Sequence, residues 1–341
     1  MTAPETLEQL EDLLSTPTAL AIETLARFDD DLLLLGVGGK MGPTLARMAR
    51  RALDEAGVRR RVIGVARFSE PGLEEKMRAS GVETIRCNLL DRAEVANLPR
   101  AANVLVMVGM KFGATGQEGR TWAINTYLPG LVCERFAQAR IVAFSTGNVY
   151  GLTPVYLGGS RETDVLQPVG EYAMTAVGRE RIYDHFSRTH SQPMALLRLN
   201  YATEMRYGVL VDVAQQVLGG QPVDLSMGNL NAVWQGDANA WALCAFAQVQ
   251  TPPFVVNLAG PETLSVRRVA ETFGQLFGKE VRFTGQEGGS ALLSNGQLGH
   301  RLFGYPRVSA EQMMHWIARW LQRGGPTLGK PTHFENREGR F

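Results

Sequence analysis

The feature that most constrains the fold is a glycine-rich turn between an apolar run and a segment with helical spacing. The stretch is LLLLGVGGKMGPTLARMA, residues 32–49, in which four leucines precede Gly36, Gly39 and Gly42. A short continuous apolar run that ends in glycine is typical of a buried parallel strand. The stretch therefore predicts a strand, a tight turn and a helix.

The same alternation continues over the first 200 residues. After a helix at 43–56, further strands are expected at 60–68, 83–89, 103–110, 140–146 and 194–200, with helices at 121–138 and 171–189. Strands that alternate with helices indicate a doubly wound parallel sheet with both faces covered, the Rossmann-type α/β class.

The pattern changes along the chain and suggests four parts. Residues 1–30 read as a helical extension, with Pro17 breaking a helix expected over 4–28. The Rossmann domain is expected at 31–200, with a later segment returning near 230–260. A smaller mixed part at 201–325 is expected to bind mostly substrate, and 326–341 is expected to be an irregular polar tail.

Composition narrows the class of protein. The 341 residues are 45% hydrophobic and 20% charged with a net charge of +1, which gives no sign of a nucleic-acid or membrane partner. Cys87, Cys133 and Cys244 stand far apart, as expected in a reducing cytoplasm. No CxxC, HxH or HExxH spacing occurs, so we expect no metal site, and the acidic N-terminus lacks a signal pattern.

The glycine turn favours a bound dinucleotide over an empty tight turn. A helix that starts after such a turn directs backbone N–H groups and its positive end at a phosphate. Gly36 permits the turn, Gly39 permits close approach of a diphosphate, and Gly42 permits helix packing. The other expected contacts within the turn are Gly38, Lys40 and Met41.

The end of the second strand bears on which nicotinamide cofactor binds. An acidic residue there would bind the 2′-hydroxyl of NAD, but the chain has Ala66 followed by Arg67. An arginine favours a 2′-phosphate, and Lys40 could add charge. We therefore expect NADP or NAD, with NADP slightly favoured; the alternative is that Arg67 is only a solvated residue at the strand end.

Two later stretches resemble a known family. FSTGNVYG (144–151) and EYAMTAVGRE (171–180) are similar to the extended short-chain dehydrogenase/reductase family, which includes sugar epimerases and dehydratases. The resemblance runs over about 31–322 and includes VGMKFG (108–113), RLNYA (198–202) and FVVNLAGPETLSVRRVAETFG (254–274). The cofactor contacts that it adds are Asn88, Val108, Gly109, Lys111, Asn125 and Tyr172.

The resemblance implies a catalytic pair and also a departure from the family. Thr146 matches the residue that hydrogen-bonds the substrate oxygen, and Tyr172 matches the tyrosine that transfers a proton during hydride transfer. The family has a lysine four residues after that tyrosine, where this chain has Ala176. A free tyrosine titrates at about 10, so it is a poor base at neutral pH without a nearby cation.

Three interpretations of the missing lysine remain open. Another cation substitutes, with Lys111 the best candidate and Arg179 a weaker one. Alternatively, Tyr172 acts mainly as a proton donor. The third possibility is that catalysis is lost, which leaves an NAD(P)-binding regulatory or sensor protein.

The substrate side also departs from the family. Enzymes for nucleotide-linked sugars usually carry an Arg-x-Gly-Asp segment late in the chain, but residues 285–306 have no basic residue before His300. We therefore expect a small free sugar, sugar acid or related hydroxy/oxo compound, not a nucleotide-linked one. The expected contacts are Met110, Thr146, Asn200, Tyr201 and Arg206, of which Arg206 could pair with a carboxylate. A homodimer through the helices at 121–138 and 171–189 is implied by the resemblance.

Overall fold

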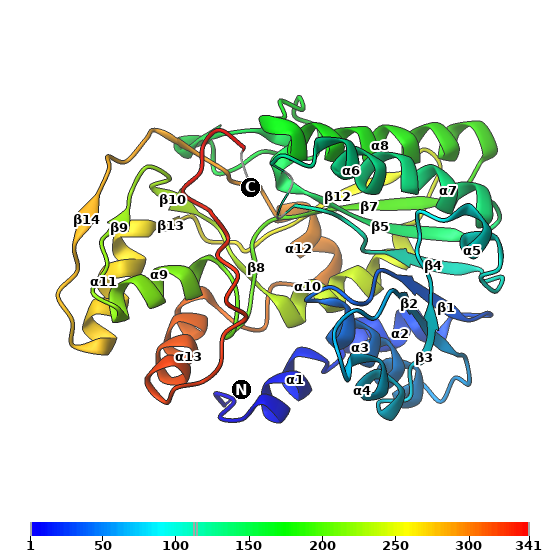
Figure 1. Ribbon diagram of the computed structural model, residues 1–341, viewed down its shortest axis with the longest axis horizontal. Helices are drawn as coiled ribbons and strands as arrows, with labels where there is room; N and C mark the ends of the chain where they lie inside the picture. Colours follow the sequence, from blue (N-terminus) through cyan, green and yellow to red (C-terminus); the bar gives the residue numbers. More distant parts are fainter. Residues whose placement is uncertain (1, 112, 114, 340–341) are drawn as a thin grey trace.

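Seven parallel strands form the central sheet, in the order β12–β7–β5–β4–β1–β2–β3 (Figure 1). The structure, a computed structural model, describes residues 2–111, 113 and 115–339. The strands are β1 (Leu32–Leu35), β2 (Val62–Ala66), β3 (Glu83–Arg86), β4 (Asn103–Val106), β5 (Arg140–Thr146), β7 (Met194–Leu199) and β12 (Phe254–Leu258). The predicted doubly wound sheet is confirmed, and its order reverses between β1 and β4.

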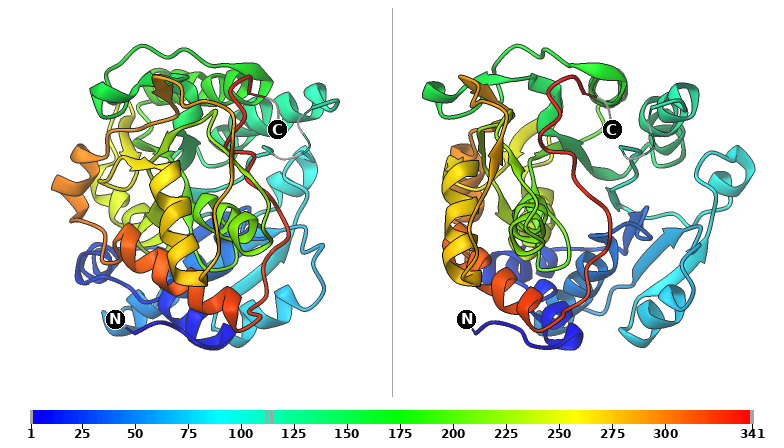
Figure 2. Two further views of the ribbon diagram at one scale, coloured as in Figure 1. Left: turned by 90° about the vertical axis from the view of Figure 1, so that its left-hand side faces the viewer. Right: turned by 60° about the vertical axis from the view of Figure 1, so that its left-hand side comes forward.

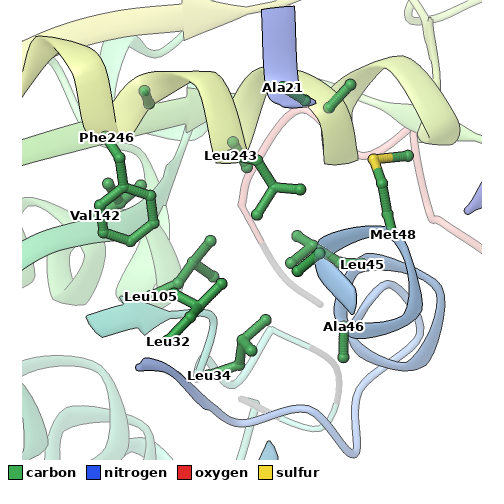
Figure 3. Close-up of a cluster of buried hydrophobic side chains, with 14 of the residues drawn as sticks. Ala21, Leu32, Leu34, Leu45, Ala46, Met48, Leu105, Val142, Leu243 and Phe246 are labelled. Atoms are coloured by element: carbon green, nitrogen blue, oxygen red, sulfur yellow. The ribbon is translucent and has the colours of Figure 1, made fainter. Parts of the chain in front are cut away.

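The four leucines of β1 supply the core on both faces of the sheet. Leu32 and Leu34 face the helices α2 (Ala19–Ala26), α3 (Gly42–Glu55) and α10 (Gln235–Cys244), as Figure 3 shows. Leu33 and Leu35 belong to the core on the opposite face. A strand buried on both sides needs apolar residues at every position, which is why this run does not alternate.

The opposite face carries the helices that border the candidate site. The helix expected at 121–138 is three consecutive pieces: α6 (Glu118–Trp122), the π-helix η1 (Ala123–Tyr127) and α7 (Leu128–Arg135). The long helix α8 (Gly170–His190) lies beside them, as predicted for 171–189. The shorter helices α4 (Leu73–Ala79) and α5 (Arg92–Ala96) connect the outer strands.

A second lobe packs on the carboxyl side of the sheet around α9 (Val209–Leu218), α11 (Val266–Phe277) and α13 (Ala310–Gln322). Trp234 packs edge-to-face on Trp316 within its core, with the ring centroids 5.6 Å apart. Its other elements, and those that join it to the sheet, are β6 (Thr153–Pro154), β8 (Ala202–Thr203), β9 (Val223–Asp224), β10 (Asn229–Leu230), β11 (Val233–Trp234), β13 (Leu264–Ser265), β14 (Phe283–Thr284), β15 (Ser290–Ala291), α12 (Gln297–Phe303) and three 3₁₀ turns, Gly147–Tyr150, Val155–Leu157 and Ala245–Gln248.

The N-terminal extension joins the two lobes. It forms α1 (Leu7–Leu14) and α2, with the expected break around Pro17. Leu10 and Leu14 are buried in the core of the second lobe, while Ala21 and Leu25 are buried beneath the sheet. The extension is therefore part of both cores.

The C-terminal tail crosses the molecule as an extended strap over residues 326–339 (Figures 1 and 2). The Leu328 N–H donates to the Arg206 carbonyl at 3.0 Å, and the Thr332 N–H and hydroxyl donate to Asp212 at 2.8 and 2.6 Å. Phe334 is buried in the core of the second lobe. The tail has no helix or strand over these residues, and it is held by these bonds and by the buried side chains of Thr332 and Phe334.

Within the part of the chain that the structure describes, no helix is both long enough and apolar enough to cross a bilayer.

The glycine turn predicts different stabilities for two variants. A Cβ at Gly42 would lie 2.1 Å from the Val37 carbonyl oxygen, whereas a Cβ at Gly39 meets only the Gly36 carbonyl oxygen at 3.7 Å. We expect Gly42→Ala to lose about 1–3 kcal/mol of unfolding free energy through overpacking, and Gly39→Ala to change it by less than about 0.5 kcal/mol. Urea unfolding of both variants measures the difference, and equal losses would contradict this account of the turn.

Candidate active site

Two cavities meet at the carboxyl ends of β1 and β4. Their volumes are about 310 and 400 Å³, and both are lined by Gly36, Gly39, Met107, Val108 and Gly109. We refer to the first, on the side of α8 and the second lobe, as the inner cavity and to the second, beside β2 and β3, as the outer cavity. Together they form an elongated groove across the point where the strand order reverses, the place where open α/β sheets bind ligands.

The glycine turn forms the floor where the cavities join. Gly36 has φ +91°, and a Cβ there would come 2.6 Å from Val108 Cγ2. Gly39 lines both cavities, and among the described residues a Cβ there would meet only the Gly36 carbonyl oxygen, at 3.7 Å. Helix α3 starts at Gly42 with Pro43 in its first turn, so its positive end lies at this floor. This arrangement fits the diphosphate of a dinucleotide whose two halves occupy the two cavities.

The outer cavity holds the residues expected at the far end of such a ligand. Gly38, Arg67 and Asn88 line it, and Arg67 is exposed directly after β2, as predicted. Ala66 stands where an acidic residue would bind a ribose, although Glu70 lines the same cavity further along the loop. The cavity therefore presents two arginines, Arg67 and Arg120, and one carboxylate, that of Glu70.

The inner cavity brings together the two residues expected to carry the chemistry. Thr146 ends β5, and Tyr172 lies in the first turn of α8; both are buried and both line the cavity. The Thr146 hydroxyl donates to Asn148 Oδ1 at 2.9 Å and accepts from the Asn148 N–H at 3.2 Å. The hydroxyl is thereby fixed at the start of a 3₁₀ turn. Met41, Lys111, Asn200 and Tyr201 line the same cavity.

Ala176 occupies the helix turn where the family lysine is expected. Its side chain is fully buried in a small apolar cluster with Val149 and Tyr150. Arg179 lies one turn further along α8, is also buried, and lines the inner cavity.

Lys40 projects into the inner cavity from the glycine turn. Its Nζ lies 2.9 Å from the centre of the Tyr207 ring. Burial, together with repulsion from Lys111 and Lys330, lowers the pKa of Lys40 to about 7, although the Asp212 carboxylate opposes the shift. This part of the cavity is therefore costly for a cation and suited to an anionic ligand.

Lys111 lies in the same cavity after β4. Burial lowers its pKa to about 8, and the carboxylates of Asp212 and Glu335 partly offset the effect. At neutral pH Lys111 is mostly charged, as required of a cation that substitutes for the missing lysine.

Several predicted residues lie away from the cavity walls. Arg206 is held by Glu204 and Glu11, with N–O distances of 2.8 and 3.5 Å, and does not line either cavity. These two carboxylates explain why the structure does not bring it to a ligand. Asn125 is fully buried and bonds the backbone of Met110, and neither residue lines a cavity.

Sequence reasoning missed other residues of the inner cavity. Tyr207 enters from the loop before α9, Gln235 from the start of α10, and Thr332 from the tail. None of them belongs to a recognisable motif, and only the polar composition of the tail hinted that it could reach a site.

The buried charge of Lys111 predicts a pH-dependent stability. A free lysine titrates at about 10.4, so between about pH 8 and 10 the unfolded chain binds more protons at this residue than the folded chain, and folding stability rises with pH. We expect Lys111→Met to stabilise the protein at pH 7 and to remove part of that rise.

Urea unfolding of the ligand-free protein at pH 7 and pH 9.5 measures this effect. The control is Lys279→Met, at an exposed lysine, which should leave both midpoints unchanged. If Lys111→Met is less stable than the wild type at pH 7, the charge of Lys111 does not lower the free energy of unfolding, and this account is wrong.

Comparisons with known proteins agree on the fold. Neither a family model nor a curated protein matches the sequence, but solved structures do. UDP-glucose 4-epimerase from Thermotoga maritima is 18% identical with a TM-score of 0.71, over 86% of this chain and 99% of that one.

Two further solved structures give the same picture. dTDP-glucose 4,6-dehydratase from Streptomyces venezuelae, with NAD bound, is 18% identical with a TM-score of 0.71, over 86% of this chain and 97% of that one. UDP-glucose 4-epimerase from Thermus thermophilus, in complex with NAD, is 17% identical with a TM-score of 0.69, over 86% and 99%. The chain therefore has the fold expected from its resemblance to the extended short-chain dehydrogenases/reductases.

Proposed function

We propose that this protein is an NAD(P)-dependent oxidoreductase or epimerase for a small free sugar, sugar acid or related hydroxy/oxo compound. The observation that carries the proposal is that Tyr172 and Thr146 line one cavity, which is continuous with the groove over the glycine turn. The solved structures of UDP-glucose 4-epimerase and dTDP-glucose 4,6-dehydratase, two of which hold NAD, have the same fold and so favour the same type of chemistry.

The groove residues would hold the cofactor. Gly36 and Gly39 would accommodate the diphosphate, Asn88 and Arg67 the adenosine half, and Val108 and Gly109 the junction. When bound, the nicotinamide would donate or accept a hydride. The two similar structures named with NAD favour a nicotinamide cofactor, and exposed Arg67 after Ala66 favours the 2′-phosphate of NADP.

The chain's own residues would manage the proton. The Thr146 hydroxyl, still accepting from the Asn148 N–H, would turn its single proton from Asn148 Oδ1 to the reacting substrate oxygen. The Tyr172 hydroxyl would give that oxygen a proton or take one from it. Lys111 would supply positive charge in the same cavity and favour the tyrosinate when Tyr172 acts as base. Both residues are largely buried, which would limit the access of bulk water to the reacting atoms.

The tail supports a small free substrate. Thr332 forms part of the inner cavity wall, so the strap lies over the side that faces the second lobe. Arg337, further along the tail, donates to the carbonyls of Ser226 and Ser290 at 3.0 and 2.8 Å. Arg337 therefore contacts the stretch 285–306, which the family resemblance matches to the segment that carries the diphosphate clamp. The similar structures are named for nucleotide-linked sugars, so the substrate test must include these compounds.

The second candidate function is binding without chemistry. Ala176, buried against Val149 and Tyr150, favours a protein that keeps the cofactor groove and acts as a regulator or sensor. The buried free thiols of Cys87, Cys133 and Cys244 support a cytoplasmic location for either function.

The catalytic proposal predicts a large effect at Tyr172. We expect the wild type to turn over at least one free sugar or sugar acid, and Tyr172→Phe to lower turnover by about 10²–10⁴-fold because the proton-transferring hydroxyl is lost. Cofactor binding should persist in the variant. Nicotinamide absorbance and product analysis over a panel of free sugars, sugar acids and UDP- and dTDP-linked sugars measure the activity.

The matched control is Tyr305→Phe, at a tyrosine that is 71% exposed, which should retain full activity. Equal activity of Tyr172→Phe and the wild type would end the catalytic proposal. Turnover of only nucleotide-linked sugars would refute the proposed substrate class.

The cofactor proposal predicts a selective effect at Arg67. Loss of a charge-assisted bond to the 2′-phosphate should weaken NADP binding by about tenfold or more in Arg67→Ala and leave NAD binding within about twofold. Calorimetry with both dinucleotides measures this, with Arg59→Ala, an exposed arginine before the other end of β2, as the control. Equal losses for NAD and NADP would remove the assigned role of Arg67, and binding of neither by the wild type would remove the cofactor.

We also propose a homodimer through α6, η1 and α8. Trp122, Tyr127 and Met174 are large apolar side chains that are 40–49% exposed on these helices. Met174→Glu should give a monomer by light scattering at micromolar concentration, because it places a charge within the apolar patch. Tyr305→Glu, in an exposed loop after α12, should remain dimeric; a monomeric wild type would contradict the proposal.

A further inference from the structure

The side chain of Arg179 extends back along α8 toward the helix turn that contains Ala176. This is the turn in which the family carries its lysine and this chain carries no cation. Side chains on a helix tilt toward its N-terminus, so a long side chain at 179 reaches back along the face that carries 172 and 176. Its Nη2 donates to Asn125 Oδ1 at 2.6 Å, and the Asn125 Nδ2 donates to Thr175 Oγ1 at 2.9 Å. The charge of Arg179 therefore lies beside residues 172–176, one turn ahead of its own Cα.

Three hydrogen bonds fix the guanidinium. Besides the bond to Asn125 Oδ1, Nη1 donates to the Phe144 carbonyl at 3.0 Å, and Nε donates to the Asn125 carbonyl at 3.3 Å. A guanidinium has five N–H groups, so these bonds among the described residues leave one on each terminal nitrogen. Because Arg179 lines the inner cavity, a ligand can meet these remaining donors.

All three acceptors of Arg179 are neutral oxygens. Within residues 2–111, 113 and 115–339, no carboxylate lies within 4.0 Å of its nitrogens, whereas the equally buried Arg198 pairs with Glu180 at 2.7 Å. A buried arginine stays charged, and a buried charge without a counter-ion is costly. An anion entering the cavity would offset that cost.

The guanidinium lies where the two cavities join. A Cβ at Gly109 would come 3.0 Å from Arg179 Nη2, and Gly109 lines both the inner and the outer cavity. An elongated ligand that runs through the groove must pass this point.

Arg179 also acts through Asn125 on the residue before Lys111. Asn125 Oδ1 accepts from the Met110 N–H at 2.8 Å, and its Nδ2 donates to the Met110 carbonyl at 3.0 Å. The amide of Asn125 thus clamps both backbone groups of Met110, and Arg179 holds the amide in the orientation that this requires. Loss of Arg179 would loosen the backbone that carries Lys111.

We propose that Arg179 shares the role of the missing lysine with Lys111: the fixed charge of Arg179 serves the bound dinucleotide at the junction of the cavities, and its bonds to Asn125 position Lys111. Arg179 is on this account a positioning residue that supports proton transfer at Tyr172. The inference rests on the proposed function only for its effect on turnover, because cofactor affinity is measured separately.

The test removes the positive charge at position 179 and then introduces a positive charge at position 176. Arg179→Met keeps the length and removes the charge, Arg179→Lys keeps the charge, and the double variant Arg179→Met/Ala176→Lys restores a cation at the family position. We expect Arg179→Met to weaken dinucleotide binding by about tenfold or more and to move the lower limb of the pH–rate profile to higher pH. Arg179→Lys should stay within about threefold of the wild-type affinity, and the double variant should recover most of the loss.

The control is Arg181→Met, at an exposed arginine on the same helix, which should change neither affinity nor pH profile. Dinucleotide affinity is measured by calorimetry on protein whose folded state is checked by thermal unfolding. If Arg179→Met does not fold, Arg179→Lys and Arg179→Lys/Ala176→Lys carry the test, and wild-type affinity in Arg179→Lys supports the role of the charge.

Two results would overturn the inference. One is wild-type affinity and an unchanged pH profile in folded Arg179→Met, and the other is an equal loss in Arg179→Lys and Arg179→Met. Failure of the proposed function looks different: the wild type would turn over none of the compounds, while the Arg179 variants would still differ in dinucleotide affinity.

Discussion

The contact between the start of α3 and the end of β1 is the constraint on which the site depends. Gly42 packs so closely on Val37 that a Cβ would lie 2.1 Å from its carbonyl oxygen. This closeness sets the N-terminus of α3 directly over the carboxyl ends of β1 and β4, where the two cavities join. Every other element of the groove, from the loop after β2 to the first turn of α8, is placed relative to that junction.

The buried side-chain amide of Asn125 fixes the wall of the groove that lies opposite the glycine turn. The π-helix Ala123–Tyr127 widens the helix by one residue and places Asn125 inside the protein, where it bonds Met110, Thr175 and Arg179. All four hydrogen-bonding positions of this side chain are thereby used, which fixes α8 and the segment after β4 relative to each other. A π-turn costs regular helix geometry and is frequent at functional sites.

The sequence predicts the parts of the protein that follow local rules. The strands of the sheet and the break at Pro17 follow from apolar runs, glycines and the proline itself. The pair Thr146 and Tyr172 follows from the family resemblance alone, and the two residues line one cavity. Residues whose positions depend on distant partners could not be predicted. Arg206 is drawn aside by Glu11, almost two hundred positions earlier in the chain, and Thr332 reaches the cavity only because the tail is bound to Asp212. On sequence Arg179 is the weaker candidate cation, because its spacing of seven residues from Tyr172 does not show that its long side chain extends back along the helix.

The positive charges of the inner cavity bear on ligand binding, whereas the proposed reaction depends on other groups. Lys40, Lys111 and Arg179 all line it, and burial lowers the pKa of both lysines, so the folded protein holds them at a cost. The burial of these cations makes the cavity favourable for an anionic ligand, whether or not a reaction follows. The chemistry depends instead on two neutral hydroxyls, Thr146 and Tyr172. A pure binding protein would have no need to keep both beside the same cavity with Thr146 fixed by Asn148, and this retained pair is why we favour the enzyme over the sensor.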